Sequence, residues 1–248
     1  MRETRIIMGM PISLGVLDAQ VRSQDLDAVF AEFTAADDQF SPFKYGSEIS
    51  RLNRGEINEE DLTPRMLEIL ALCEKTKQKT SGYFNITRPD GTIDLCGFVK
   101  GWAIKNAALQ LTGMGFSNFC VEAGGDIQCH GLNDEGQEWT VGIRSPFTRD
   151  EIVKILRPRG HGVATSGNYI RGDHIYNPHT GQYGSDDIVS LTVIGPDVLE
   201  ADCYATAALA MGREGIYFIE RTPDLEGYEI DASGTARMTS GLKKYLSC

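Results

Sequence analysis

Asn118-Phe-Cys-Val-Glu-Ala-Gly-Gly-Asp-Ile-Gln-Cys-His130 is the stretch of the sequence that decides the fold class. Residues 118–122 and 127–130 have the composition of short strands, and a Gly-Gly-Asp turn separates them. The two glycines suit either an ordinary hairpin turn or a close approach of the backbone to a flat ligand. On this pattern alone, the hairpin is the favoured interpretation.

More strands are expected on both sides of this hairpin. The sequence predicts them at residues 12–17, 83–86, 139–144 and 187–194, the last as a buried strand. A mixed sheet is the simplest interpretation of these segments.

Two helices are expected in the first third of the chain. One begins at Ser23 and carries apolar residues at the i, i+3, i+4 and i+7 positions. The other has Thr63 as its N-cap and Pro64 at its first position, runs to about Lys79, and has Gly82 beyond its end.

Two further helices are expected later in the chain. One starts at about Lys100, and the other covers about residues 198–211, after a start at Asp197 and Glu200 that resembles a capping box. With no clear linker and no internal repeat, helices and strands are expected to mix in one α+β domain.

The composition limits the possible partners. The chain has 248 residues, 41% of them hydrophobic, which is enough for a substantial core. Its formal net charge of −11 argues against a nucleic-acid partner, because the chain would repel the phosphate backbone. An acidic protein that handles a small phosphorylated ligand is instead expected to recruit a divalent cation.

The cysteines and the N-terminus indicate the compartment. The six cysteines contain no CxxC pair, so we interpret them as reduced thiols rather than as a disulfide framework. No apolar stretch approaches the length of a membrane span, and the first residues do not have the pattern of an export leader. The expected compartment is the cytoplasm, although a chain with a removed leader would look identical.

Asp202 and Thr206 form the first candidate site. They stand four residues apart and therefore share one face of the predicted helix, where a carboxylate and a hydroxyl could ligate one hard cation. The alternative is an ordinary capped helix whose aspartate is solvated in the first turn.

The segment Ile93-Asp-Leu-Cys-Gly-Phe-Val-Lys-Gly-Trp-Ala103 is the second candidate. We expect it to lead from a strand into a helix through Gly97 and Gly101, so that a phosphate could approach the helix N-terminus beside Lys100. The alternative is a tight glycine turn with a surface lysine.

Two neighbouring segments form the third candidate. Ala164-Thr-Ser-Gly-Asn-Tyr169 and His174-Ile-Tyr-Asn-Pro-His-Thr-Gly181 are expected to give a polar loop that could supply a general base and hydrogen bonds to phosphate. The alternative is a plain surface loop. A zinc site is not indicated, because His174 and His179 have no third ligand at the usual spacing.

The order of these motifs along nearly the whole chain resembles that of the ApbE family of Mg²⁺-dependent FAD:protein FMN transferases. The matching segments are Met8-Gly-Met-Pro, Phe40-Ser-Pro-Phe, Ser47-Glu-Ile-Ser-Arg-Leu-Asn53, Ser81-Gly-Tyr-Phe-Asn-Ile-Thr87, Ile93 to Ala103, Glu122-Ala-Gly-Gly-Asp126, Ala164-Thr-Ser-Gly167, His174 to Gly181 and Ala201-Asp-Cys-Tyr-Ala-Thr-Ala207. A collinear series is far more specific than any one of its motifs.

The resemblance implies a fold and a reaction. The fold would be a single α+β domain over residues 1–248, with two mixed lobes around a largely antiparallel, T-fold-like sheet. In the reaction, a threonine hydroxyl of a target protein attacks the FMN-side phosphorus of FAD, AMP leaves, and FMN remains in a phosphoester bond to the target. The implied ligands are therefore FAD, as substrate, and Mg²⁺.

The resemblance also implies site residues. Asp202 and Thr206 would hold Mg²⁺ together with a backbone oxygen near Gly97, and His174 would assist deprotonation of the threonine, so that His174 and Asp202 are the expected catalytic residues. The residues expected to contact the flavin nucleotide are Met8, Phe43, Tyr83, Phe84, Asn85, Asp94, Lys100, Gly124, Gly125, Ser166 and Thr180.

The sequence departs from the family pattern at three places. Only residues 88–92 separate Thr87 from Ile93, where the family usually has a longer segment. Asn85 and Asn177 stand in place of acidic residues, and Cys96 stands where glycine or serine is common. Two alternatives therefore stay open: a flavin-binding module without transferase activity, and a hydrolase that converts FAD to FMN and AMP.

Overall fold

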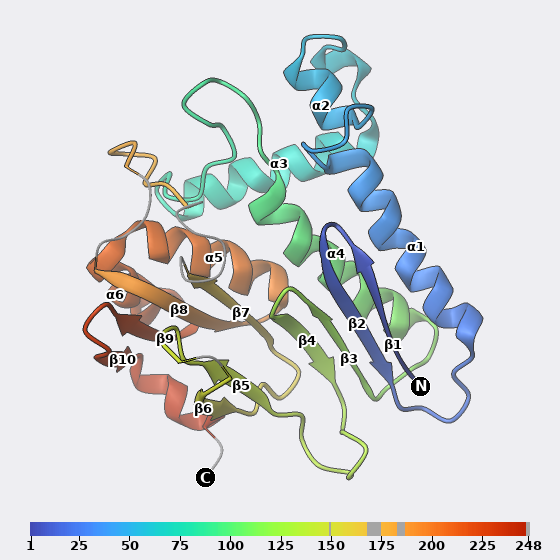
Figure 1. Ribbon diagram of the computed structural model, residues 1–248, viewed down its shortest axis with the longest axis vertical. Helices are drawn as coiled ribbons and strands as arrows, with labels where there is room; N and C mark the ends of the chain where they lie inside the picture. The colour runs from blue at the N-terminus through green and yellow to red at the C-terminus, as the bar shows by residue number, and fades with distance from the viewer. Residues whose placement is uncertain (149, 168–174, 183–186, 247–248) are drawn as a thin grey trace.

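An antiparallel sheet of eight strands organises the part of the chain that the computed structural model describes, residues 1–148, 150–167, 175–182 and 187–246 (Figure 1). Its spatial order is β1 (Arg2–Ile7), β2 (Met10–Val16), β3 (Phe119–Ala123), β4 (Asp126–His130), β7 (Gly162–Gly167), β8 (Ile188–Gly195), β9 (Glu226–Asp231) and β10 (Ala236–Met238). All of these pairs are antiparallel. The α+β class with a largely antiparallel sheet is confirmed, and the mixed sheet is wrong.

The β3–β4 hairpin at the centre of the sheet has the predicted turn. Ala123 pairs with Asp126, and the two residues between them, Gly124 and Gly125, have φ angles of 59° and 95°. Positive φ at both central residues is the requirement of a two-residue type I′ turn, which glycine meets without steric cost. The hairpin interpretation of this stretch is confirmed.

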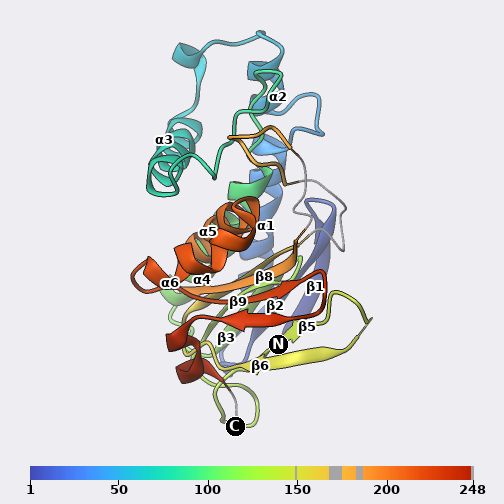
Figure 2. The ribbon, with the colours of Figure 1, turned by 90° about the vertical axis from the view of Figure 1, so that its left-hand side faces the viewer.

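The helices are α1 (Ser23–Phe40), α2 (Glu48–Asn53), α3 (Pro64–Lys79), α4 (Cys96–Gly113), α5 (Val198–Ala210) and α6 (Gly215–Arg221), with 3₁₀ turns at Glu59–Asp61, Gly212–Glu214 and Ser240–Tyr245. Of these, α1, α4, α5 and α6 pack on one face of the sheet, whereas α2 and α3 lie beyond its end (Figure 2). The main core lies between these helices and the sheet, and α4 and α5 pack against each other. None of the helices in the described ranges is both long and apolar enough to cross a membrane.

The opposite face of the sheet has its own smaller core. A two-stranded ribbon of β5 (Val141–Arg144) and β6 (Ile152–Leu156) covers it together with the C-terminal 3₁₀ turn. Val141 and Leu156 from the ribbon and Tyr245 from the turn are buried there beside Tyr228 of β9.

The predicted helix starts are mostly confirmed because their caps form. The Thr63 hydroxyl accepts a hydrogen bond from the Met66 amide at 3.3 Å, and the Asp197 carboxylate accepts one from the Glu200 amide at 3.0 Å. These side chains satisfy amides that have no partner inside the helix. The first helix begins at Ser23, as predicted.

Three local predictions are wrong. Residues 83–86 form no strand; only Thr87 makes an isolated bridge, with Ile93. The helix expected from about Lys100 begins a full turn earlier, at Cys96. The Ala164-Thr-Ser-Gly segment, expected in a polar loop, belongs to strand β7. In each case pairing or packing with a distant segment, and not the local pattern, decides the conformation.

We predict that Gly162→Ala destabilises the protein because β7 passes very close to the start of α5. A Cβ atom on Gly162 would lie 2.0 Å from the Val198 nitrogen and 2.3 Å from the Asp197 carbonyl carbon. Overpacking against backbone should lower the free energy of unfolding by about 2 kcal/mol or more. Urea denaturation measures this change.

Gly113→Ala is the matched control, because a Cβ atom there would meet no atom of the described residues within 4 Å. It should change the free energy of unfolding by at most about 1 kcal/mol, toward higher stability. Equal effects of the two substitutions would contradict the close approach.

Candidate functional site

A buried ion-pair cluster joins the sheet to two helices. The Lys100 ammonium on α4 pairs with the Asp126 carboxylate at the start of β4, and lies 3.4 Å from Asp202 Oδ1 on α5. The side chains of Lys100, Asp126 and Asp202 are only 12%, 1% and 4% exposed. One cation therefore faces two carboxylates in a place from which most water is excluded.

Gly101 allows the two helices to approach closely enough for this cluster. A Cβ atom on Gly101 would lie 3.0 Å from Leu199 Cα and 3.2 Å from both Asp202 Cβ and Asp202 Oδ2. Both Gly97 and Gly101 lie inside α4 and neither has a positive φ angle, so the alternative interpretation, a tight glycine turn, is wrong. The glycine at 101 serves helix packing next to the candidate site.

Burial and the neighbouring charges shift the pKa of Asp202. Burial, followed by the like charge of Asp126, raises the pKa of Asp202 to about 7, although Lys100 opposes this shift. Asp126 has a further partner in the Thr165 amide of β7, which donates a hydrogen bond to Asp126 Oδ1 at 3.2 Å. Asp202 is thus the carboxylate of the pair that an additional cation would stabilise.

One oxygen of Asp202, Oδ2, is buried beside Gly101 and has no hydrogen-bond donor among the described residues. Thr206 follows one turn later on α5, and its hydroxyl lies 3.3 Å from the Ser166 hydroxyl of β7. A carboxylate oxygen and nearby hydroxyls are hard oxygen ligands, so these residues fit Mg²⁺.

Protein ligands alone do not complete a metal site here. The described part of the chain has no group of three or more His, Cys, Asp and Glu residues arranged around one point. A magnesium ion held here would need waters and phosphate oxygens of a substrate in addition to one or two carboxylates.

Asp94 lies just before α4 and connects this helix to the preceding segment that contains Arg88. Its carboxylate accepts a hydrogen bond from the Cys96 amide at 2.9 Å and forms an ion pair with Arg88. Burial alone would raise the pKa of Asp94, but the Cys96 amide and Arg88 together lower it. Asp94 is therefore an anion at the helix N-terminus, where the positive end of the helix dipole favours negative charge.

The 175–182 segment contacts the loop after α3. The His179 ring packs on Tyr83 with 4.4 Å between ring centroids, and its Nε2 lies 3.0 Å from the Ser81 carbonyl oxygen. Tyr176 donates a hydrogen bond to the Thr87 carbonyl. Thr180 lies in the tight turn that follows Asn177. Tyr83 and Thr180 are thus held by two loops that contact each other.

The other nucleotide residues expected from the resemblance are dispersed. Met8 lies in the β1–β2 turn with φ of 56°, and Phe43 is 87% exposed in the loop between α1 and α2. Phe84 is buried in the main core, where it packs near Phe98. Their roles toward a nucleotide stay predictions.

For two more of the expected residues, Gly125 and Asn85, the structure shows the immediate surroundings, and the third, His174, is not described. Around Gly125, at the hairpin tip, the described residues leave open space where a Cβ atom would be. The Asn85 side chain accepts a hydrogen bond from the Thr87 amide at 3.1 Å. His174 lies outside the described residues.

Asp126 is the residue that the sequence interpretation missed. It closes the Glu122-Ala-Gly-Gly-Asp126 motif, but only the two glycines were assigned to the site. An aspartate directly after a tight turn usually serves the turn, so its type gave no separate signal. The structure instead turns its carboxylate toward Lys100 on another element.

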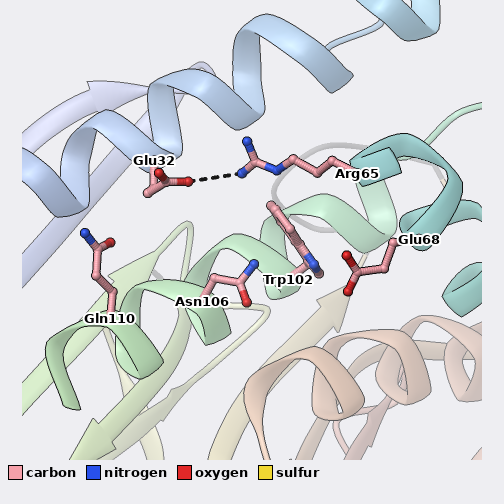
Figure 3. Close-up of a pocket in the computed structure, with 6 residues that line it drawn as sticks. All are labelled: Glu32, Arg65, Glu68, Trp102, Asn106 and Gln110. Carbon is pink, nitrogen blue, oxygen red and sulfur yellow. Dashed lines mark hydrogen bonds and ion pairs between the residues drawn. The ribbon is translucent and has the colours of Figure 1, made fainter. Parts of the chain in front are cut away.

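A groove of about 470 Å³ lies on the other side of α4 (Figure 3). It is lined by Glu32, Arg65, Glu68, Trp102, Asn106 and Gln110. Arg65 bridges it, with an ion pair to Glu32 at 3.2 Å and its guanidinium 4.7 Å from the centre of the Trp102 ring. Trp102 and Asn106 point away from the Lys100 face of the helix, so this groove is separate from the ion-pair cluster.

Comparisons with known proteins agree with the resemblance. The model of the ApbE family matches residues 8–90 and 87–228. The FAD:protein FMN transferase of Klebsiella pneumoniae (strain 342) is 34% identical over 168 residues, which cover 64% of this chain and 47% of that protein. The enzyme of the same name from Escherichia coli (strain K12) is 32% identical over 182 residues, or 70% of this chain and 51% of that protein.

The chain thus spans about half the length of these curated relatives. Solved structures share its fold over nearly the full length. The flavin transferase ApbE from Vibrio cholerae has a TM-score of 0.86 at 22% identity and 99% coverage of both chains. The ApbE protein from Thermotoga maritima also has a TM-score of 0.86, at 19% identity, with 100% of this chain and 99% of that one covered.

We predict that Asp202 makes the stability of the metal-free protein fall as the pH rises. Its pKa of about 7 in the fold lies above the ordinary aspartate value of 3.8, so folding disfavours the ionised form. Relative to Asp202→Asn, the wild-type free energy of unfolding should therefore decrease between about pH 4 and pH 7, by on the order of 3 kcal/mol. Urea denaturation with a chelator present, over this pH range, measures the difference.

Glu200→Gln is the control, because Glu200 lies on the same helix with its side chain 38% exposed. If wild type and Asp202→Asn keep a constant difference at every pH, Asp202 does not titrate as the cluster requires.

Proposed function

The chain belongs to the ApbE family, and on that premise we propose that it is an enzyme that transfers FMN from FAD to a target protein. The curated relatives carry the name FAD:protein FMN transferase. Because the chain spans about half of their length, the activity is proposed here and rests on the residues of the site.

The buried cluster of Lys100, Asp126 and Asp202 is the observation that carries the proposal. Burying two carboxylates beside one lysine costs free energy through desolvation, and hydrophobic residues of the same size would avoid that cost. A site for a phosphorylated substrate explains the arrangement, since it needs both a cation for the phosphate and a carboxylate for a metal ion.

In this proposal Asp202 and Thr206 hold Mg²⁺, with a backbone oxygen near Gly97 as a further ligand. When bound, the ion would neutralise charge on the FAD pyrophosphate oxygens. The ion pair with Asp126 directs the Lys100 ammonium toward the same place, and Lys100 then provides a point charge for a phosphate oxygen.

The transfer itself is a displacement at phosphorus. The threonine oxygen of the target forms a bond to the FMN-side phosphorus, and the bond from that phosphorus to the bridging pyrophosphate oxygen breaks. AMP leaves with that oxygen, and the threonine proton goes to His174 in the assignment that the resemblance implies. FMN remains bound to the target through a phosphoester.

In the proposed transfer, the enzyme would accelerate the reaction mainly by positioning FAD and the acceptor threonine. Little covalent chemistry falls to the protein in phosphoryl transfer, so fixed charges and the alignment of two reactants dominate. The two loops that meet at Tyr83 and His179 lie beside the segment that leads to Asp94. In our proposal they bind the flavin side of FAD, and the hairpin tip at Gly125 faces the nucleotide.

We predict that Asp202→Asn lowers the rate of FMN transfer about hundredfold or more, because it removes the charged metal ligand. Purified protein is incubated with FAD, Mg²⁺ and a flavinylation substrate that carries an acceptor threonine. AMP, free FMN and protein-bound FMN are then quantified by chromatography and mass spectrometry. Glu200→Gln, on the same helix, should keep the wild-type rate.

Three outcomes of this assay separate the possible functions. AMP formed together with protein-bound FMN supports the transferase. AMP together with free FMN identifies a hydrolase instead. FAD that stays intact in the presence of several threonine-bearing targets identifies a flavin-binding module and contradicts the proposal.

We also predict that Mg²⁺ stabilises the wild-type protein, since a ligand that binds only the folded state raises its stability. The thermal midpoint should rise with Mg²⁺ concentration in wild type and in Glu200→Gln, and should stay constant in Asp202→Asn. Differential scanning calorimetry measures these midpoints. An equal rise in all three proteins would exclude Asp202 as the metal ligand.

A further inference from the structure

Two cysteines face each other in the central hairpin. Cys120 on β3 and Cys129 on β4 are directly opposite in the register of the two strands. Both are thiols in the structure, Cys120 partly exposed and Cys129 buried. They belong to different strands but to the same hairpin, whose tip carries Gly124, Gly125 and Asp126.

The position of this pair in the ladder favours a disulfide. The two-residue turn closes on the pair Ala123 and Asp126, and in antiparallel ladders hydrogen-bonded pairs alternate with non-hydrogen-bonded ones. Counted from the closing pair, Cys120 and Cys129 form a non-hydrogen-bonded pair. Side chains are closer in such pairs, at Cα separations of about 4.5 Å, within the range that disulfides span.

The register places the two thiols on the same face of the hairpin. The neighbouring Cys120 thiol, and then burial, raise the pKa of Cys129. On β2 the residue paired with Cys120 is Gly15, and the Arg2 side chain covers it, with Arg2 Cγ 3.6 Å from where a Cβ atom of Gly15 would be. Cys120 is nevertheless partly exposed, so a small oxidant can reach it, while the buried Cys129 is the second thiol.

We propose that Cys120 and Cys129 form an intrachain disulfide when the protein meets a small disulfide oxidant such as oxidised glutathione. This is a modification site separate from the flavin chemistry. The proposal changes the sequence interpretation, in which all cysteines were reduced thiols without a partner. That interpretation looked for closely spaced cysteines, and a pair on two neighbouring strands does not show such spacing.

The reaction is a pair of thiol–disulfide exchanges. The Cys120 thiolate attacks one sulfur of oxidised glutathione, forms a mixed disulfide and releases one glutathione thiolate. The Cys129 thiolate then attacks the Cys120 sulfur and releases the second glutathione. The protein loses two electrons and two protons, and one oxidised glutathione becomes two reduced glutathiones.

The bond would lock the hairpin that presents Asp126 to Lys100. A disulfide between the strands fixes their register from Cys120 to the tip, and thus holds the first residue of β4 in place. Oxidised protein should therefore resist thermal unfolding better than reduced protein, and reduction by dithiothreitol should reverse the difference.

Mass spectrometry of the oxidised chain tests the proposal. The Cys96→Ser, Cys248→Ser background removes the exposed Cys96 and the C-terminal thiol. After incubation with oxidised glutathione, free thiols are alkylated in denaturant without reduction. Because no Lys or Arg lies between Lys105 and Arg144, trypsin leaves both cysteines in one peptide, and a second cleavage after Glu122 separates them.

We expect the two fragments to remain linked in most chains and to separate after reduction. Cys129→Ala in the same background should instead accumulate one glutathione on Cys120, and Cys120→Ser should give neither product. The buried Cys73 and Cys203 act as internal controls and should be recovered alkylated. The contradicting result is defined under conditions in which Cys129→Ala becomes glutathionylated on Cys120. If the background protein then carries an alkylated Cys129, with Cys120 either alkylated or glutathionylated, no disulfide has formed and the proposal is overturned.

Discussion

The ion pairs of Lys100 with Asp126 and Asp202 are the interaction on which the rest of the site depends. A lysine and two carboxylates that are almost fully buried are tolerated only when they face one another, because an unpaired buried charge costs several kcal/mol. The three residues come from α4, β4 and α5. The cluster can therefore form only when the central hairpin and both helices have taken their places.

Several small features make that arrangement possible. The glycine turn at Gly124 and Gly125 brings Asp126 to the start of β4, and Gly101 lets α5 approach α4. Gly162 lets β7 pass beneath the capped start of α5, one turn before Asp202. A side chain at Gly101 or Gly162 would separate two elements, so the packing of α5 on α4 and β7 is tightly constrained around the cluster.

Local chemistry predicted much of this structure but could not predict the cluster. Caps at Thr63 and Asp197 and the Gly-Gly turn are short-range signals, and the elements they mark were found. The start of α4, the strand at β7 and the partner of Asp126 depend on contacts between segments far apart in the chain. Asp202 and Thr206 were recognisable from their spacing on one helix face, whereas nothing near Asp126 in the sequence pointed to Lys100.

The most direct test is a calorimetric titration of FAD in the presence of Mg²⁺ into wild type, Lys100→Met and Lys105→Met. Lys105 lies on the same helix but pairs with Asp197 outside the cluster, so it controls for the loss of a lysine. If the cluster binds the pyrophosphate, Lys100→Met should weaken FAD binding about tenfold or more, and Lys105→Met should leave it nearly unchanged. Equal affinity of all three proteins for FAD would contradict the account.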